Sequence, residues 1–503
     1  MARPAAGGVM RIRNPAMSID APQLAPGVRA GPSDARPDVT ASPTAIGGFL
    51  RSVRRLLQIV RYRATCHIFS HPGLLKAAFA VLRVVRPVTV VGKLAVVTRA
   101  ADIRDVLERF DDFITGDVIE PGTPWGSFLM TIDWREQHQC ERGMLESVVR
   151  PAADMAAIRA IAAGVCRSRI AALAHSGRLD VVADLAEPVM VRIFADYIGV
   201  PPLDGSPSRM ARAMRNLAGI IMVNPPQGSQ AWRDSRADMT SLTRQLLNQL
   251  TAAPPSPMQP AGPGSSGPEQ TLFARLRRRD AQAERPPWFD DDWIRRYLTG
   301  LVATGGATII RGTAHAVDRL LDDEAALQRA RHLAQRLDRP ATETPATQDL
   351  AADDAGAQAE KTREALRQCI YEALRFRPML PLLVRDCPRR TIIAKGTARA
   401  RLIPAGTRVI ASPLAAMFDP EAFPNPSAFS ERPLESYFHF GFGPRRCFGK
   451  YIADIAMLEI VRALAALPQL ARASGAAGRV RYEGPAPCAL AVTFAPFDPG
   501  ATP

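Results

Sequence analysis

The chain has 503 residues, of which 47% are hydrophobic, and its formal net charge is +15. This apolar share builds a core and excludes a globally disordered chain, and seven cysteines do not indicate a small disulfide-stapled scaffold. No run of about 18 apolar residues is free of charge, so we expect neither a membrane-spanning helix nor a secretory signal. The first 100 residues carry 15 Lys/Arg and 3 Asp/Glu, so the positive excess sits in one segment and no nucleic-acid partner is expected.

The N-terminal part changes character near residue 47. Residues 1–46 are rich in Pro, Ala, Gly and Arg without an apolar period, and we expect a disordered leader there. An amphipathic helix is predicted over residues 49–63, with an apolar stripe from Phe49 to Val60 and arginines on the other side. Two interpretations stay open. The favoured one docks the helix on the core, and the other lays residues 49–63 on an anionic membrane as a peripheral contact.

The rest of the chain mixes long helical periods with short strands. A hairpin is predicted over Pro87–Val97, around Gly92-Lys93. Helices are predicted over 152–174, 179–199, 293–321, 361–376 and 449–467, strands over 390–394, 408–412, 479–483 and 488–494, and loops at 252–268 and 339–358. Because no βαβ alternation is present, we expect a mainly α fold with small β-sheets, one domain over 47–497 and a tail over 498–503.

The chemistry concentrates in the segment Phe440–Gly449, directly before the last predicted helix. A cysteine at a helix start meets the positive end of the helix dipole and free backbone N–H groups, which favour the thiolate. The flanking glycines permit positive φ and the close approach of a flat ligand. Phe440 and Phe448 shield the sulfur from water, and Arg445 offers a fixed cation to a carboxylate. A shielded thiolate beside a cation is what a haem iron ligand requires, so Cys447 is the candidate metal ligand.

The segment Phe-Gly-Phe-Gly-Pro-Arg-Arg-Cys-Phe-Gly resembles the haem-binding loop of the cytochrome P450 family, whose form is Phe-Gly-x-Gly-x-Arg-x-Cys-x-Gly. The resemblance implies a helical prism enclosing one haem b (iron protoporphyrin IX), with Cys447 as the axial iron ligand. It also implies that Arg445 contacts a haem propionate and that Phe440 and Gly449 belong to the cofactor-binding loop. It covers about residues 80–497.

Further segments match the family in order along the chain. Glu372 and Arg375 have the family's Glu-x-x-Arg spacing, one helical turn apart, and Arg432 matches the arginine that completes a buried Glu-Arg-Arg cluster. Downstream of this helix, the resemblance implies that Arg385 binds a propionate. Two other pairs share the spacing and are expected to be exposed: Glu360/Arg363 and Glu364/Arg367.

A second basic pair lies nearer the N-terminus. His138 and Arg142 resemble the His-x-x-x-Arg pair that touches the haem propionates, and a spacing of four places both side chains on one helix face. The preceding segment, which starts at Asp133, is one residue longer than the usual form of this motif. A solvent-exposed pair is therefore the alternative.

The predicted helix 293–321 is expected to cross the haem. Its Thr304-Gly305-Gly306-Ala307-Thr308 segment lies where the family shows Ala/Gly-Gly-x-Asp/Glu-Thr, so Thr308 matches the threonine that helps to deliver protons to bound oxygen. The glycines are expected to loosen the helix and open a groove for O2. Ala307 departs from the pattern because the family has an acid there, and a shift by one residue places Ile309 at the threonine position. The alternative role for Thr308 is a hydrogen bond to its own backbone.

The resemblance implies a haem-thiolate monooxygenase that inserts one oxygen atom from O2 into an apolar small molecule, with secondary metabolism as the setting. The missing acid keeps a second function open, a hydroperoxide-using peroxygenase or lipid hydroperoxide isomerase or lyase. A basic membrane- or nucleic-acid-binding protein is a remote third. Arg311, one turn past Thr308, is either an anchor for a substrate carboxylate or, as favoured, a solvated helix residue.

The resemblance also implies an electron-donor partner, a location and a substrate pocket. No flavin or nicotinamide fingerprint is present in the sequence, so electrons are expected from a separate ferredoxin or flavodoxin-type donor that meets Arg446 and Lys450. The expected location is cytoplasmic, with a peripheral membrane contact as an option. The substrate pocket is expected to be lined by Ile119, Phe128, Leu129, Met130, Leu382 and Leu383.

Overall fold

The computed structural model describes residues 45–116, 126–252, 270–282, 284–338 and 348–498. The chain divides into two units, Met1–Val53 and Arg54–Pro503, and all described elements belong to the second unit apart from the first residues of helix α1. The predicted leader 1–46, the loop 252–268 and the tail 498–503 fall almost wholly outside the described residues.

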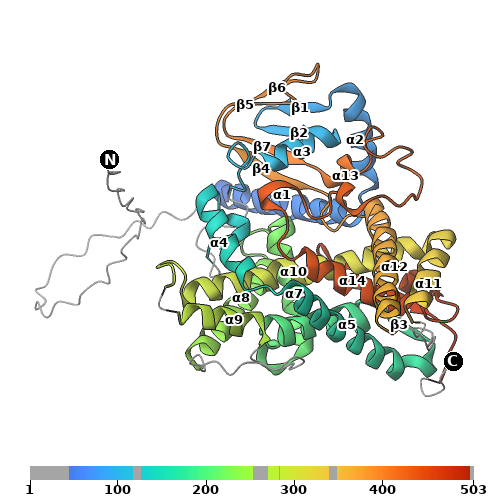
Figure 1. The fold of residues 1–503 in the computed structure, drawn as a ribbon. Helices are drawn as coiled ribbons and strands as arrows, with labels where there is room; N and C mark the ends of the chain where they lie inside the picture. The colour runs from blue at the N-terminus through green and yellow to red at the C-terminus, as the bar shows by residue number, and fades with distance from the viewer. Residues whose placement is uncertain (1–44, 117–125, 253–269, 283, 339–347, 499–503) are drawn as a thin grey trace, which may run out of the picture. The chain divides into compact units, whose positions relative to one another are not determined.

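The fold is mainly helical with small sheets, as predicted (Figure 1). The helices are α1 (Ala45–Ser70), α2 (Gly73–Val85), α3 (Ala100–Glu108), α4 (Arg135–Ser147), α5 (Pro151–Leu173), α6 (Glu187–Arg192), α7 (Pro207–Val223), α8 (Gln230–Ala252), α9 (Leu272–Asp280), α10 (Asp291–Leu321), α11 (Glu324–Asp338), α12 (Gln348–Phe376), α13 (Pro413–Ala416) and α14 (Lys450–Ala465). Two π-helical segments, η3 (Val181–Ala186) and η4 (Ile193–Ile198), flank α6, and short 3-10 turns include η1 (Leu129–Thr131) and η8 (Gly443–Arg445).

The strands form four small sheets. They are β1 (Val88–Val91), β2 (Leu94–Val97), β3 (Arg178–Asp180), β4 (Leu383–Cys387), β5 (Thr391–Ile393), β6 (Arg401–Ile403), β7 (Thr407–Ala411), β8 (Ala471–Arg472), β9 (Arg481–Glu483), β10 (Ala486–Ala489) and β11 (Ala491–Thr493). The largest sheet has the order β1-β2-β7-β4, in which β2 and β7 are parallel and the other pairs antiparallel. The other sheets are β3-β11-β8, β5-β6 and β9-β10. The predicted hairpin over Pro87–Val97 is confirmed as β1 and β2.

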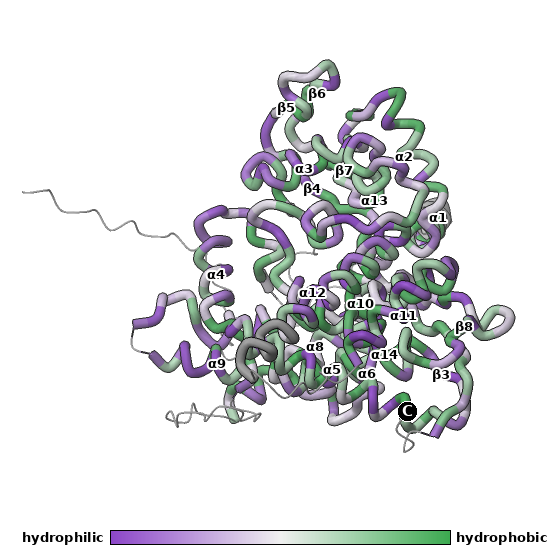
Figure 2. The backbone as a smooth tube through the Cα atoms, turned by 45° about the vertical axis from the view of Figure 1, so that its right-hand side comes forward, coloured by the Kyte–Doolittle hydropathy of each residue, from purple (hydrophilic) through white to green (hydrophobic). Residues whose placement is uncertain are grey.

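Helix α10 is the core helix of the unit. It begins after Asp290, whose side chain accepts a hydrogen bond from the Trp293 backbone N–H at 2.8 Å, as an N-cap aspartate does. It packs against α7, α12 and α14, and most of its side chains are buried. Figure 2 shows hydrophobic colouring around α10 and α14. These two helices therefore fix the positions of Thr308 and of the cysteine loop that precedes α14.

Some predicted elements need correction. The helix predicted over 179–199 starts instead as strand β3, because Arg178–Asp180 pairs with β11 and local helical period yields to this tertiary partner. The strand predicted over 488–494 is divided at Leu490, where the chain passes from the β9-β10 sheet to the β3-β11-β8 sheet. The polar gap predicted over 339–358 is helical from Gln348 onward; its alanines favour helix, and polarity alone does not make a loop.

The favoured interpretation of the 49–63 helix is wrong where its side chains are described. The helix exists, as part of α1, but Leu56, Leu57 and Val60 are 61%, 63% and 55% exposed and do not dock on the core. In the described part of the chain no single helix has the length and apolarity to cross a membrane. Residues Leu56–Ser70 and Gly73–Val85 meet such a criterion only together, and they are bent by 83°.

Candidate functional site

The loop before α14 holds its cysteine by backbone geometry. Gly441 and Gly443 both have φ of +68°, and a Cβ on Gly443 would lie 2.8 Å from the Cα of Glu108 on α3. The Cys447 N–H donates a hydrogen bond to the Phe440 carbonyl at 2.9 Å, which closes the loop. The left-handed backbone and this close approach explain the two glycines, because other residues are strained there. The sulfur is thereby held just before the first turn of α14.

The Cys447 sulfur lies deep in the protein and still has accessible surface. Burial raises the pKa of its thiol, while a backbone hydrogen bond from Gly449 and the charge of Arg142 act in the opposite direction. The thiolate-stabilising effects predicted at a helix start are therefore present, but burial outweighs them and the net pKa of the thiol is raised.

Two arginines from distant parts of the chain, Arg445 and Arg385, lie close enough for each to feel the charge of the other. Arg445 donates to the Asp133 carboxylate at 2.7 Å and to the Ile132 carbonyl at 2.8 Å, and its guanidinium lies 3.8 Å from the Phe110 ring centroid. Its Nε has no hydrogen-bond partner. Arg385, on β4, has a hydrogen bond to the Val384 carbonyl at 2.8 Å and forms no ion pair with a described residue. Burial and then the charge of Arg445 lower the pKa of Arg385 to about 10.

His138 and Arg142 both lie on α4, but the two side chains contact different groups. His138 is 1% exposed, lies edge-on to Phe110 at 5.0 Å between ring centroids, and leaves its Nδ1 without a partner. Burial, then the charges of Arg445 and Arg142, lower the pKa of His138 to about 4, so the ring is neutral at pH 7. Arg142 pairs with Glu146 at 2.7 Å and donates to the Arg446 carbonyl at 2.7 Å. The solvent-exposed alternative is therefore wrong for His138, and Arg142 braces the cysteine loop.

These residues fit a group that carries anionic carboxylates. Arg445 and Arg385 disfavour each other's charge, and Asp133 is the one described carboxylate that forms an ion pair with either. A buried cation without a counter-charge is costly, and a bound carboxylate would offset that cost. The orphaned Arg445 Nε and His138 Nδ1 are further unused polar atoms. A flat group with carboxylates on one edge and a metal at its centre, such as haem, matches this donor set beside a cysteine sulfur.

The predicted Glu-Arg-Arg cluster is confirmed. Glu372 and Arg375 are both 0% exposed and form an ion pair at 2.7 Å, and Arg432 reaches the same carboxylate at 3.4 Å. Tyr437 donates to that carboxylate at 2.9 Å, and Arg375 donates to three backbone carbonyls, those of Met417, Pro426 and Ala428. The cluster therefore ties α12 to the segment that leads into the cysteine loop.

The pairs that share this spacing lie on the outer side of α12. Glu360 pairs with Arg363 at 3.4 Å and also with Arg367, so Arg367 takes Glu360 as its partner and not the predicted Glu364. Glu360 and Glu364 are exposed. Only burial distinguishes the structural pair from these surface pairs, and burial is not visible in a four-residue motif.

Two neighbouring threonines of α10 donate their hydroxyls to the backbone of the helix itself. Thr308 donates to the Thr304 carbonyl at 2.6 Å, and Thr304 donates to the Gly300 carbonyl at 2.7 Å. The predicted alternative for Thr308 is thus what the structure contains. The groove expected at the glycines is filled at Gly306, because a Cβ there would collide with the Met214 side chain of α7. A Cβ on Gly305 would meet only Phe194, at 3.7 Å, so this one position has room.

Arg311 is not the solvated helix residue that was favoured. It is 0% exposed and donates to the carbonyls of Pro485 and Phe69, while its Nε has no partner. Burial lowers its pKa to about 10. These contacts join α10 to the turn between β9 and β10 and to the end of α1. Arg311 therefore connects three segments, and no carboxylate of a described residue pairs with it.

The residues of the predicted apolar pocket wall differ in burial, and their role as a pocket wall stays a prediction. Phe128 is buried against Gly300, and a Cβ on that glycine would lie 2.5 Å from the Phe128 ring, so the two elements touch directly. Leu129 and Met130 in η1 and Leu382 before β4 are partly buried, whereas Ile119 lies outside the described residues. Sequence reasoning gave no role to Phe110 or Asp133. Asp133 could have been predicted as a partner because it is the first residue of the α4 motif, whereas no sequence pattern indicates Phe110.

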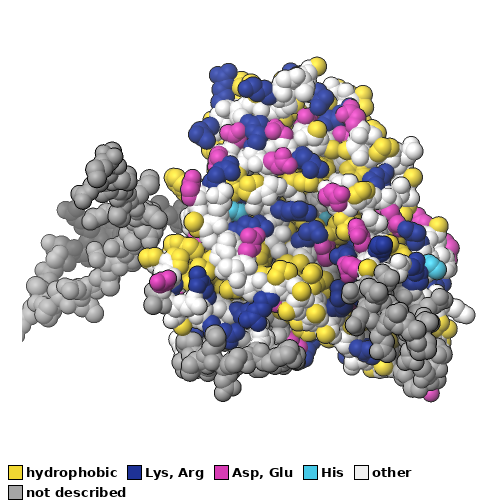
Figure 3. Space-filling model, in the orientation of Figure 1, with side chains coloured by type: hydrophobic (Ala, Val, Ile, Leu, Met, Phe, Trp, Pro, Cys, Tyr) yellow, Lys and Arg dark blue, Asp and Glu magenta, His cyan; other side chains and the backbone are white. Residues whose placement is uncertain are grey.

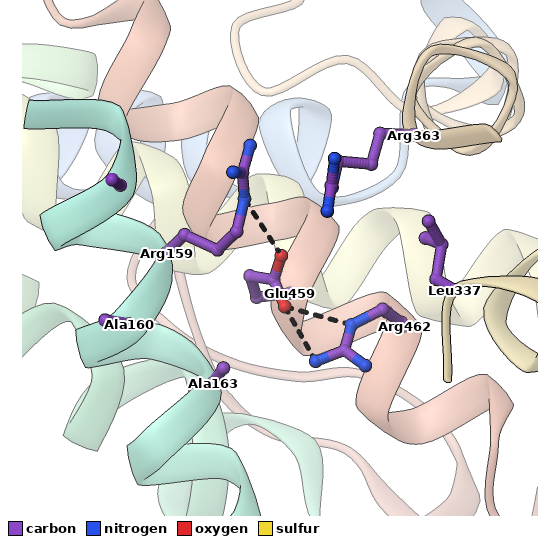
Figure 4. A pocket seen from close by; sticks show the side chains of 8 residues that line it. Arg159, Ala160, Ala163, Leu337, Arg363, Glu459 and Arg462 are labelled. Carbon is purple, nitrogen blue, oxygen red and sulfur yellow. Dashed lines mark hydrogen bonds and ion pairs between the residues drawn. The ribbon is translucent and has the colours of Figure 1, made fainter. Parts of the chain in front are cut away.

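A separate surface pocket lies between α5, α12 and α14 (Figure 4). Its floor is Glu459, which is 2% exposed and pairs with Arg462 at 2.9 Å and Arg159 at 3.7 Å. Glu459 lies twelve residues after Cys447, three turns along α14. Because its arginines already have acidic partners, this pocket is a surface ion-pair cluster away from the cysteine loop.

Comparison with known proteins places this geometry in context. A family model described as Cytochrome P450 matches residues 357–466, which contain both the buried Glu-Arg pair and the cysteine loop. Linoleate diol synthase of Gaeumannomyces graminis is 43% identical over 86 residues, 17% of this chain and 7% of that protein. Psi-producing oxygenase A of Emericella nidulans is 26% identical over 329 residues, 61% of this chain and 28% of that protein.

A shorter relative and two solved structures add to this picture. Cytochrome P450 monooxygenase drtD of Aspergillus calidoustus is 41% identical over 105 residues, 20% of this chain and 19% of that protein. The chain therefore matches less than a third of the length of each of these three curated relatives. The structure of CYP109E1 from Bacillus megaterium with testosterone has a TM-score of 0.65 at 18% identity, covering 85% of this chain and 99% of that one. P450BioI in complex with a hexadec-9Z-enoic acid-ligated acyl carrier protein has a TM-score of 0.66 at 16% identity, covering 86% and 100%.

Proposed function

The chain belongs to the cytochrome P450 family, as a haem-containing oxidoreductase, and we propose that Cys447 is the thiolate ligand of its haem iron. The support is the loop geometry, which fixes the sulfur before α14 and leaves Cys447 exposed. Among the other cysteines, four are buried: Cys66, Cys166, Cys369 and Cys387. Cys140 is exposed and Cys488 is half-buried, but neither lies in a glycine-flanked loop before a helix.

Five more residues of the loop and its surroundings would hold the cofactor. Arg445 and Arg385 would pair with the propionates, and His138 would offer its unpartnered Nδ1 to the same edge. Phe440 and Gly449 would lie beside the thiolate, where Gly449 already donates its backbone N–H to the sulfur. Arg142 would hold the cysteine loop in place through its hydrogen bond to the Arg446 carbonyl. When bound, haem supplies thiolate-supported cleavage of an O–O bond, and the chain binds the substrate and excludes water.

The residues of α10 around Thr308 bear on which oxidant the enzyme uses. The Thr308 hydroxyl is engaged by its own backbone, and the acidic residues of α10 are Asp291, Asp292 and Asp318, all more than two turns from Thr308. The chain thus places no carboxylic acid of α10 beside Thr308 to pass protons toward bound O2. We therefore propose a substrate that brings its own O–O bond, a hydroperoxide of an apolar lipid. Similarity to a linoleate diol synthase supports a lipid of fatty-acid type.

Monooxygenation with O2 is the second candidate. It is supported by the similarity to a cytochrome P450 monooxygenase and by the exposed Arg446 beside the cysteine loop. An acidic ferredoxin or flavodoxin could meet Arg446 there, while Lys450 pairs with Asp454 at 2.5 Å and is the weaker contact. In this case electrons come from that separate donor, and a water molecule must replace the missing acid in proton delivery.

One experiment separates the two functions. Purified holoenzyme is given linoleic acid hydroperoxide without O2 or reductant, and in parallel linoleic acid with O2, NADPH, a ferredoxin and its reductase. We expect turnover in the first reaction, and Thr308→Ala should keep it within about twofold, whereas a proton-delivery role is worth about 100-fold. Thr313→Ala is the matched control because Thr313 also bonds its helix backbone, at 3.0 Å to Ile309. Turnover only in the second reaction would reject the hydroperoxide proposal.

A further inference from the structure

Helix α2 presents an aliphatic face to the outside of the protein. Leu74, Val81, Val84 and Val85 are 76%, 63%, 82% and 76% exposed, and the alanines between them on this face are exposed as well. Their spacing follows the helical period, so they form one continuous stripe. We call the stripe the α2 outer face; its members are Leu74, Ala77, Ala78, Val81, Val84 and Val85.

The cations of α2 point the opposite way. Arg83 is 6% exposed and donates to the backbone carbonyls of Thr98, Phe418 and Ala415. Lys76 lies 3.8 Å from the ring centroid of Phe418. A helix on a protein surface in water normally turns its charged residues outward and its aliphatic ones inward. This inversion is not a consequence of packing on the core, because the aliphatic stripe has nothing against it in the described structure.

The charged residues that neighbour this face in the sequence are of one sign. Residues 54–101 contain no Asp or Glu, and four basic side chains here are exposed: Arg61 and Arg63 on α1, Arg86 after α2 and Lys93 in the β1-β2 turn. Exposed aliphatic residues recur nearby in sequence on α1, at Leu56, Leu57 and Val60. From outside this segment, Asp419 pairs with Arg83 and Arg99, and the exposed Glu421 pairs with Arg99. Figure 3 shows acidic and basic side chains interspersed on the face that it draws. The segment itself combines an apolar stripe with exposed cations and no acids, a combination that favours an anionic apolar phase.

We propose that the α2 outer face is a peripheral membrane-binding surface for bilayers that contain anionic lipids. The helix has 13 residues, whereas crossing a bilayer takes about 20, so it lies along the interface and does not span it. A protein partner is the less suitable occupant, because binding hot spots are usually Trp, Tyr or Arg, and this stripe consists of Leu, Val and Ala alone. The inference does not depend on which oxidant the enzyme uses.

The test is vesicle flotation of the full-length holoenzyme. Vesicles of phosphatidylcholine with phosphatidylglycerol are compared with vesicles of phosphatidylcholine alone, at low and high salt. We expect binding to the anionic vesicles, weakened by salt, and a partition constant about 100-fold lower for the double variant Val81→Glu/Val84→Glu, since each buried valine contributes about tenfold. The matched control is Leu247→Glu/Ile392→Glu, which changes exposed aliphatic residues on α8 and β5 and should bind like the wild type.

Three results would overturn the proposal. The wild type could fail to float with anionic vesicles, or the α2 double variant could float as well as the control. Alternatively, light scattering could show a dimer in solution that the α2 double variant dissociates and the control does not, which would make the face an interface between copies. Far-ultraviolet circular dichroism and the carbon monoxide spectrum of each variant verify that folding and haem binding are intact, and a conservative Val81→Ala/Val84→Ala pair, with a smaller drop, replaces the glutamates if they do not fold.

Discussion

Replacing Glu372 by glutamine should cost the protein several kcal/mol of stability while leaving its surface unchanged. The carboxylate is 0% exposed and accepts hydrogen bonds from Arg375, Tyr437 and the Ser430 backbone N–H. Glutamine keeps the volume but leaves the 0%-exposed Arg375 guanidinium without a counter-charge. Breaking one partner of a buried pair costs about 3–5 kcal/mol, and the three carbonyls that Arg375 also contacts place our expectation near the lower end, about 3 kcal/mol.

The assay is urea unfolding of the holoenzyme, followed in parallel by far-ultraviolet circular dichroism and by the haem absorbance. Glu364→Gln is the matched control because Glu364 lies two turns earlier on α12 and is exposed; a surface change of this kind is worth within about 0.5 kcal/mol. Haem loss should precede global unfolding in Glu372→Gln, since the cluster holds the segment leading to the cysteine loop. Equal midpoints for the two variants would show that the buried pair is not what stabilises this region.

Cys447→Ser should remove the thiolate signature of the carbon monoxide spectrum, whereas Cys488→Ser, at a half-buried cysteine, should keep it; the reverse result would refute the proposed ligand. Arg385→Leu should weaken haem retention by about tenfold, the effect of roughly 1.4 kcal/mol from one lost charge-assisted contact, measured by haem transfer to apomyoglobin, with the exposed Arg389→Leu as the control. Burial lowers the pKa of His439 to about 4, so the unfolded chain takes up its proton first. Stability should therefore fall as pH drops from about 6.5 to about 4, by about 1.4 kcal/mol per pH unit for this group at most. His439→Gln should flatten that slope in urea midpoints measured across the same range, and an unchanged slope would exclude this residue as the cause.

Long periodic segments were predictable because their signal is local. The helices at α5, α10 and α14 have boundaries within a few residues of those predicted from apolar period and flanking turns. The short strands were harder, since a strand of three residues such as β3 is defined by its partner β11, more than 300 residues away. Likewise, the alanine-rich start of α12 was assigned to a loop by its polarity, although its intrinsic preference is helical.

The candidate site also combines residues with a local sequence signal and residues that only the tertiary fold brings together. Cys447, Glu372 and Arg375 were predictable because each lies in a contiguous motif whose spacing carries the chemistry. The contacts that position them come from elsewhere: Phe110, beneath the Arg445 guanidinium, follows α3 and belongs to no motif. Arg311 shows the limit most clearly. A lone arginine on a helix was expected to be solvated although its sequence neighbours are mostly apolar, and the tertiary fold buries it completely.

The contacts between α4 and the cysteine loop are reciprocal, and this has a consequence for how the sulfur is held. Arg445 of the loop reaches Ile132 and Asp133 just before α4, while Arg142 of α4 reaches back to the loop carbonyl of Arg446. The same two segments, about 300 residues apart in sequence, are thus joined by two arginines, one contributed by each segment. A rotation of α4 would disturb the hydrogen bonds of both arginines at once, so the position of α4 and the position of the sulfur are coupled. Substitutions in α4 that never touch haem should therefore still shift the haem absorption spectrum.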